Sequence, residues 1–148
     1  DAAHLASGVG GKILKVQSYT DTTARSHNTS TITDSGLSFS FTPVSTDGTL
    51  VYIFSIALAQ PDSSQYGKCR VKVGGTVKAQ TNINGSNYTN RREVMWGKSV
   101  THSLTSGSAV VFTVELWTGD NTIYMNRAGI TGNEDDFVTT LTIFEVGA

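Results

Sequence analysis

The sequence predicts an all-β fold: a sandwich or barrel of about eight antiparallel strands. Three observations favour this class. Apolar residues come in bursts of strand length, many of them alternating with Ser and Thr. Turn-forming pairs that contain Gly, Asp or Asn recur between these bursts. No segment combines helical periodicity with the capping residues of a convincing helix.

Length and composition fit a single domain with a core of its own. The chain has 148 residues, of which 38% are hydrophobic and 16% charged, and it contains 15 Gly but only 2 Pro. A net charge of −1 gives no reason to expect nucleic acid or an acidic membrane surface as a partner. No apolar stretch is long enough to predict membrane insertion. The lone Cys69 excludes an internal disulfide framework and a cysteine-based zinc site.

The first part of the chain predicts a flexible entry segment followed by strands. Residues 1–10 are small and Gly-rich, which predicts a linker before a single domain over residues 11–148. Lys12 to Tyr19 predicts the first strand, with its apolar residues facing inward or toward a partner. Thr20 to Thr33 fits either an edge strand or a loop. Gly36 to Thr42 alternates strictly between apolar residues and Ser, which predicts a half-buried strand.

The longest apolar run, Thr49 to Ala59, is the expected central strand. Its periodicity alone would also fit a helix. It is rich in β-branched and aromatic residues, and turn signals stand on either side of it at Asp47-Gly48 and Gln60-Pro61. A strand that is apolar on both faces must bury both of them. Because the sequence offers no helix layer, we predict that another copy of the chain covers one face.

Two faces of this strand are candidates for that contact between copies. We assign the oligomer interface to Tyr52, Phe54 and Ile56. The alternative is the opposite face, which carries Val51 and Ile53.

The second half predicts five further strand regions separated by turns. Gly74-Gly75 predicts a hairpin, and the strong first and last strands are expected to pair within one sheet. The five regions are Lys68–Lys72 with Thr76–Gln80, Glu93–Leu104, Ser108–Thr118, Thr122–Asn126 and Phe137–Val146.

Catalytic and metal-binding chemistry has little support in the sequence. Cys69 shares an apolar face with Val71 and Val73, which predicts a buried structural thiol. The acidic cluster Glu134, Asp135 and Asp136 is contiguous, whereas a hydrolytic pair needs carboxylates held apart on rigid elements. We interpret the cluster as a solvated loop, with a bound cation as the weaker alternative. The prediction is a protein that is not an enzyme and has no cofactor.

Polar stretches that contain aromatic residues are the better candidates for a binding site. A rigid aromatic face beside adaptable amide and hydroxyl groups is typical of adhesive surfaces. A basic pair can stack on a ligand or bind phosphate, although in a chain of nearly zero net charge such a pair is more often a solvated surface feature. Trp117 is predicted to be a core or interface residue instead. The ligand-binding candidates are Tyr66, Tyr88, Asn87, Arg91 and Arg92.

Four segments of the chain form a recognisable series: GKILKV (Gly11 to Val16), FSFTPVSTDGTLVYI (Phe39 to Ile53), YMNRAG (Tyr124 to Gly129) and TTLTIFEVGA (Thr139 to Ala148). In this order they resemble a class of tailed-bacteriophage virion proteins of the marine and cyanophage type. Proteins of this class occur as C-terminal domains of tail fibres or as small free structural proteins.

The resemblance implies a jelly-roll-like antiparallel β-sandwich that forms a homotrimer on the virion. It implies a receptor-binding role, in which the tip of a fibre or spike binds a host-surface glycan or protein and packs on other virion proteins. The binding loops would be Gln60–Lys68, Thr81–Arg92 and Ile130–Asp136. A capsid decoration protein without a host ligand is the alternative, and a capsule-degrading enzyme is a more distant one. The class has no binding motif whose residues could be transferred to this chain.

Overall fold

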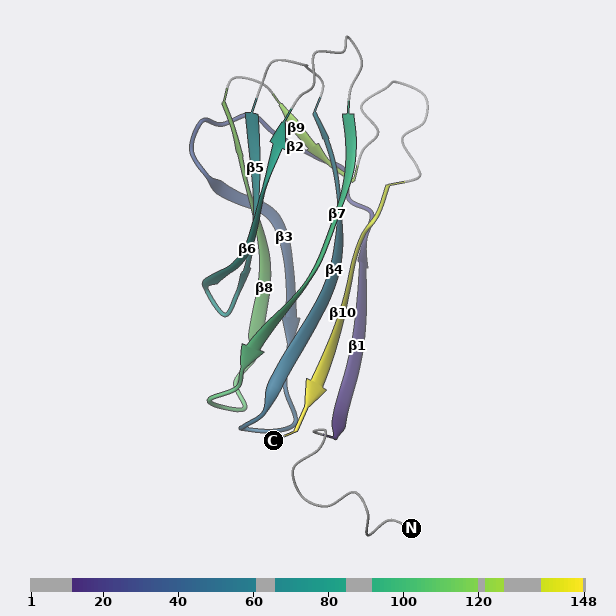
Figure 1. Ribbon diagram of the computed structural model, residues 1–148, viewed down its shortest axis with the longest axis vertical. Coiled ribbons are helices and arrows are strands. Elements are labelled where there is room, and N and C mark those ends of the chain that lie inside the picture. The colour runs from purple at the N-terminus through teal and green to yellow at the C-terminus, as the bar shows by residue number, and fades with distance from the viewer. Residues whose placement is uncertain (1–11, 61–65, 85–91, 120–121, 127–136, 148) are drawn as a thin grey trace.

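The structure is a computed structural model that describes residues 12–60, 66–84, 92–119, 122–126 and 137–147. These residues form ten β-strands (Figure 1). No helix that could cross a membrane occurs in this part of the chain. The strands are β1 (Ile13–Asp21), β2 (Arg25–His27), β3 (Thr33–Phe41), β4 (Thr49–Gln60), β5 (Tyr66–Val73), β6 (Thr76–Asn84), β7 (Arg92–Ser103), β8 (Val110–Thr118), β9 (Ile123–Met125) and β10 (Thr139–Val146).

The strands form two facing antiparallel sheets. Sheet A has the order β1-β10-β4-β9-β2, with β7 also paired to β4, and sheet B has the order β3-β8-β5-β6. When the two three-residue strands β2 and β9 are set aside, the eight long strands are ordered β1-β10-β4-β7 and β3-β8-β5-β6. This order, with the chain passing repeatedly from one sheet to the other, is that of an eight-stranded jelly roll. The predicted all-β, jelly-roll-like antiparallel sandwich is confirmed.

Strand β4 lies at the centre of sheet A, as its apolar sequence predicts. It pairs with β7 along its whole length, with β10 over Thr49 to Ser55, and with β9 at Leu58 and Ala59. The first and last strands, β1 and β10, pair from Ile13↔Val146 to Asp21↔Thr139, which confirms the expected pairing of the two ends of the domain.

The core lies between the two sheets and is built from alternate residues of the long strands. Phe112 of β8 is its aromatic centre, with ring centroids 6.0 Å from Tyr52 and 5.7 Å from Phe54 of β4. The side chains of Tyr52, Phe54 and Ile56 are all buried in this core. Our assignment of these three residues to an oligomer interface is therefore wrong, because they pack against the second sheet of their own chain. The opposite face of β4 looks outward.

Strand β1 turns its apolar residues outward, which excludes the inward one of the two orientations predicted for them. Ile13 and Val16 are 56% and 52% exposed, whereas Lys15 and Tyr19 point inward and are half-buried. The Lys15 ammonium lies 4.6 Å from the centroid of the Phe41 ring and donates a hydrogen bond of 2.8 Å to the Thr42 carbonyl. An inward lysine is tolerated here because β1 is an edge strand, so the stem covers the ring while the charged head reaches a polar partner.

Candidate functional surfaces

The three predicted binding segments join strand ends that lie at one end of the sandwich, the upper end in Figure 1. The register shows this directly. Gln60, the last residue of β4, pairs with Arg92, the first residue of β7. Tyr66, the first residue of β5, pairs with Asn84, the last residue of β6. The strands thus bring together the ends of two segments that are far apart in the sequence.

Of the predicted ligand-binding residues, the structure describes the backbone of two, Tyr66 and Arg92, as the first residues of β5 and β7. Both therefore lie at the upper end. The remaining candidates fall outside the described residues, as do the candidate cation ligands. They are Asn87, Tyr88 and Arg91, and Glu134, Asp135 and Asp136.

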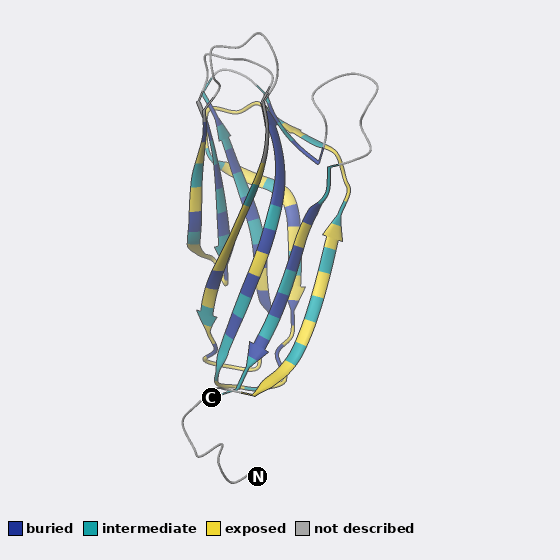
Figure 2. Cartoon of the chain, turned by 45° about the vertical axis from the view of Figure 1, so that its right-hand side comes forward, coloured by how far each residue is buried: buried dark blue, intermediate teal, exposed yellow. Residues whose placement is uncertain are grey.

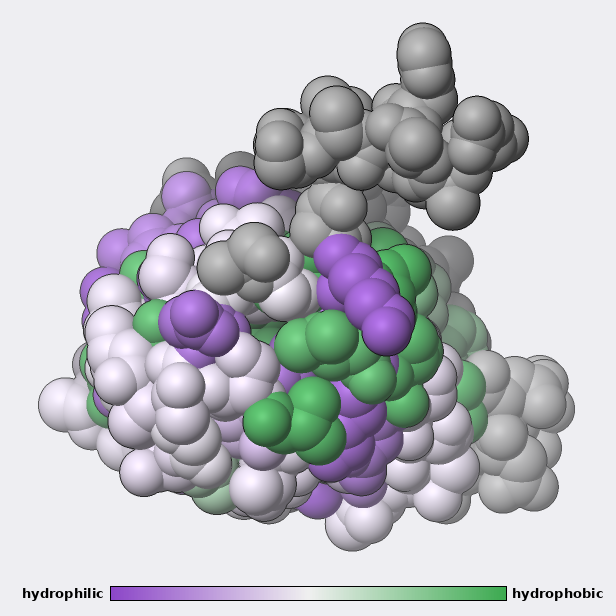
Figure 3. All heavy atoms as spheres, turned by 90° about the horizontal axis from the view of Figure 1, so that it is seen from below, coloured by the Kyte–Doolittle hydropathy of each residue, from purple (hydrophilic) through white to green (hydrophobic). Residues whose placement is uncertain are grey.

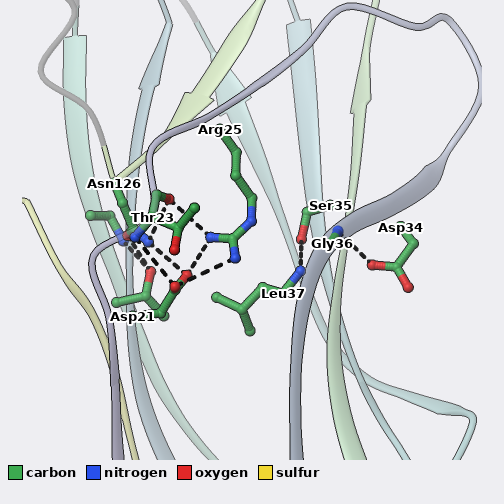
Figure 4. A network of polar contacts seen from close by, with 10 residues as sticks. Asp21, Thr23, Arg25, Asp34, Ser35, Gly36, Leu37 and Asn126 are labelled. Carbon is green, nitrogen blue, oxygen red and sulfur yellow. Dashed lines mark hydrogen bonds and ion pairs between the residues drawn. The ribbon is translucent and has the colours of Figure 1, made fainter.

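A buried polar network fixes the strand ends on either side of the third segment (Figure 4). Asn126 follows β9, is 2% exposed and adopts a left-handed backbone with φ of 53°. Its side-chain amide donates to a carboxylate oxygen of Asp21 at 2.9 Å, and its amide oxygen accepts from the hydroxyl of Thr139 at 2.7 Å. The end of β1, the end of β9 and the start of β10 are thereby held together.

Arg25 completes this network from the side of β2. Its guanidinium pairs with the Asp21 carboxylate and donates to the Thr23 carbonyl at 2.9 Å. Burial pushes the pKa of Asp21 upward, but the hydrogen bonds from Arg25 and Thr23 and the charge of Arg25 together hold it below its ordinary value. A lowered pKa stabilises the fold at neutral pH, and this contribution is lost as the pH falls through that pKa. This network was not predicted from the sequence, because Asp21 and Asn126 are 105 residues apart.

Exposed and half-buried residues cover the outer side of β1, β10, β4 and β7 in sheet A (Figure 2), and the four rows nearest the lower end contain no charged residue. The register places sixteen outward residues in four rows across β1, β10, β4 and β7. We call this set the A-face. Each row gives one residue from each strand in that order: Ile13, Val146, Thr49 and Ser103; Val16, Phe144, Val51 and Thr101; Ser18, Thr142, Ile53 and Ser99; Thr20, Thr140, Ser55 and Gly97.

The outer face of sheet B differs in chemistry. Three cationic residues occupy every second position of β5, and carboxylates lie on β8 and β3. Lys72 forms an ion pair of 3.0 Å with Glu115, and Arg70 donates to the Gln80 side chain at 2.7 Å. We call this set the B-face. Its charged residues are Lys68, Arg70, Lys72, Glu115 and Asp34.

Trp117 lies on the B-face rather than in the core. Its ring is half-buried, 5.3 Å from the Lys68 ammonium, and its indole N–H donates to the Ser30 carbonyl at 2.6 Å. Of the two predicted roles for Trp117, core or interface, the structure excludes the core. A tryptophan can occupy an outer position because the indole keeps its one donor satisfied while the cation covers the ring.

Exposed apolar side chains also gather at the lower end of the sandwich, where β1 begins and β10 ends (Figure 3). Ile13, Leu14 and Val44 are all exposed there. Val44 belongs to the turn between β3 and β4, which is held by the buried Glu145. That carboxylate accepts hydrogen bonds from the backbone N–H groups of Val44, at 3.0 Å, and Ser45, at 2.7 Å. Glu145 therefore fixes the position of an apolar turn at the base of the domain.

The remaining reactive groups in the described part of the chain are structural. Cys69 is buried in the core as predicted, and burial raises the pKa of its thiol. Burial and the nearby Lys78 lower the pKa of His102. Among the described residues, no three His, Cys, Asp or Glu side chains are grouped so that they could hold a metal ion.

No protein-family model matches this chain, and no curated protein sequence matches it either. Solved structures with a similar fold include the PRD1 vertex protein P5, with a TM-score of 0.49 and 13% identity over 93% of this chain and 100% of that one. A family 35 carbohydrate-binding module from Clostridium thermocellum gives 0.42 and 14% over 90% and 99% of the two chains. The sugar-binding EclA C-terminal domain gives 0.44 and 12% over 87% and 78%. These similarities concern the fold, and they carry no weight for function.

Proposed function

We propose that this chain is a non-enzymatic virion protein of a tailed phage. In this proposal it is a homotrimeric jelly-roll domain at the tip of a tail fibre or spike, and it binds a host-surface glycan or protein through its upper end. The class of partner comes from the sequence resemblance. The structure supports the proposal through its fold, which viral capsid and lectin domains also use, and through the placement of its surfaces.

The observation that carries the proposal is the division of the domain along its long axis. The first strand begins and the last strand ends at the lower end, beside the exposed Ile13, Leu14 and Val44 (Figures 1 and 3). The strand ends that flank the Asn-, Ser- and Gly-rich segments lie at the opposite end. A domain attached by its base and binding by its tip needs this arrangement.

Rigid strand ends suit the upper end to recognition. Gln60 and Arg92 are paired in the sheet, and the Asn126 network holds the ends on either side of residues 127–136. Variable segments on a fixed scaffold are the usual location of binding residues. Three copies side by side would raise the avidity of a weak single site by orders of magnitude, roughly 10² to 10⁴.

A loop variant with a matched control tests this proposal. The double variant Tyr88→Ala, Arg91→Ala changes two predicted binding residues of the segment that joins β6 and β7, and Thr46→Ala changes an exposed residue at the lower end. We expect the double variant to lose at least about tenfold in binding to host cells or to a glycan array, while Thr46→Ala binds like the wild type. Equal binding by all three proteins, or an assembled wild type that binds no cell and no glycan, would contradict the proposal.

The alternative role, a capsid decoration protein that packs on other virion proteins, draws support from the uncharged A-face. An extended surface without charges suits a permanent contact with protein better than exposure to water. Immunogold labelling of intact particles separates the two roles, because a fibre tip is labelled at the tail and a decoration protein over the capsid.

A further inference from the structure

We infer that the A-face is the surface through which copies of this chain contact one another. The number of copies rests on the proposed function. The location of the contact is inferred from three properties of the A-face: its lack of charge, its rows of apolar residues and its size.

The charge pattern is the first argument. None of the sixteen A-face residues is Lys, Arg, Asp, Glu or His. A soluble surface carries roughly a quarter to a third of charged residues, so about four or five would be expected among sixteen. Charged residues are depleted where an interface excludes water, because an unpaired charge is costly to desolvate. The A-face can be covered without burying a charge.

The arrangement of the apolar residues is the second argument. They gather in the two rows nearest the lower end and continue to Ile53 in the third row, and Val16 and Ile53 are 52% and 50% exposed. In β1 the apolar residues point outward and Lys15 points inward, the reverse of what favours a monomer in water. A partner on the outside removes this conflict, because the outward apolar residues then become buried.

A second copy of this chain is the occupant that fits. The A-face offers only apolar and hydroxyl groups together with Gly97, so an equally uncharged surface is complementary to it, and the A-face of another copy is such a surface. The B-face is not, because its cations and carboxylates would lose water without gaining partners. A two-fold dimer would pair two A-faces directly, whereas in a three-fold ring the A-face of each copy would turn toward the axis and meet parts of the other two.

The size of the face approaches that of a specific contact. Four strands about 4.8 Å apart and seven residues long at about 3.4 Å each give a flat area of roughly 450 Å². Two such areas come to roughly 900 Å², close to the roughly 1,000 Å² that a specific interface requires.

Charge insertion with a matched control tests the inference. Ile53→Lys places a charge in the A-face, and Val111→Lys places the same charge on the outer face of β8 in sheet B, where Val111 is 38% exposed. Both positions face water in the protomer, so neither substitution disturbs the core. The mass of each protein is measured by sedimentation equilibrium at micromolar concentration, and its fold by circular dichroism.

We expect the wild type and Val111→Lys to sediment as assemblies of several copies. Ile53→Lys should sediment near the protomer mass of 15.8 kDa with an unchanged spectrum. An assembled Ile53→Lys protein would place the interface elsewhere and overturn the inference, while leaving receptor binding at the upper end intact. A monomeric wild type would overturn the inference together with the proposed trimer.

Discussion

The outer faces of the two sheets differ, although both belong to one sandwich. The A-face consists of Ser, Thr, Gly and six apolar residues, whereas the B-face carries three cations and two carboxylates, some of them paired. Both faces have the same pleat and the same core beneath them. The difference shows that the core does not determine the chemistry of an outer face. The chemistry of an outer face depends on what that face contacts, and the charged residues of the B-face suit contact with water.

The two outer faces can be compared because the inner faces of the two sheets form a single core beneath them. Phe112 of sheet B packs on Tyr52 and Phe54 of sheet A. We expect Phe112→Ala to lower the free energy of unfolding by about 3–5 kcal/mol, measured by urea denaturation. A loss below about 1 kcal/mol would mean that the two sheets do not share this core, and the comparison of their outer faces would then lose its basis.

The buried carboxylate of Glu145 links the inside of sheet A to the lower end. It accepts backbone hydrogen bonds from Val44 and Ser45, so Glu145→Gln replaces one strong acceptor and adds a donor that has no place there. We expect a loss of about 1–3 kcal/mol in the same denaturation experiment. The assembled mass should also fall, because Glu145 lies on β10 between the A-face residues Phe144 and Val146. Unchanged stability and mass would show that this turn is not needed for assembly.

A substitution of Tyr52 tests whether the inner face of β4 contributes to stability but not to assembly. Its hydroxyl is buried and makes no hydrogen bond to any group in the described part of the chain. We expect Tyr52→Phe to raise the free energy of unfolding by about 1 kcal/mol, because an unsatisfied polar group is removed. The assembled mass should stay the same. If this variant dissociated, Tyr52 would have to be assigned to the subunit interface after all.

The ion pair on the B-face should have the smallest effect. Lys72 and Glu115 are partly exposed to solvent, and pairs of this kind contribute about 0–1 kcal/mol. Lys72→Ala is therefore expected to change stability by less than about 1 kcal/mol and to leave the mass unaltered, as judged by denaturation and sedimentation. A large change in mass would show that the charged face also takes part in assembly.

The sequence was sufficient to predict the fold class and the central strand, because alternation and turn residues act locally. The predicted strands Thr49 to Ala59 and Ser108 to Thr118 correspond to the long strands β4 and β8. The side of a sheet that faces the core is decided by residues distant in sequence. The sequence alone does not show which face of β4 packs on the second sheet. Only the position of Phe112, which packs on Tyr52 and Phe54, identifies the inner face. For this reason the interface was assigned to the wrong face of β4.

The candidate site was less predictable than the fold. The apolar residues of strand β1 were expected to face inward or toward a partner, and the sequence could not decide between the two, because an edge strand can present Lys15 to Phe41 and leave Val16 outside. The Asn126 network depends on contacts between β1, β9 and β10, and no local pattern announces it. Tyr88, Asn87 and Arg91 lie outside the described residues, so their role remains a prediction.

Thiol labelling tests the central claim, that the A-face is covered by another copy, most directly. The natural Cys69 is buried, so it should stay unreactive in the native protein, and a cysteine introduced at position 53 or 111 can be followed alone. We predict that Val111→Cys reacts rapidly with a thiol reagent, that Ile53→Cys is protected, and that adding Val16→Lys restores its reactivity. Equal labelling rates for Ile53→Cys and Val111→Cys in the wild-type background would contradict the claim.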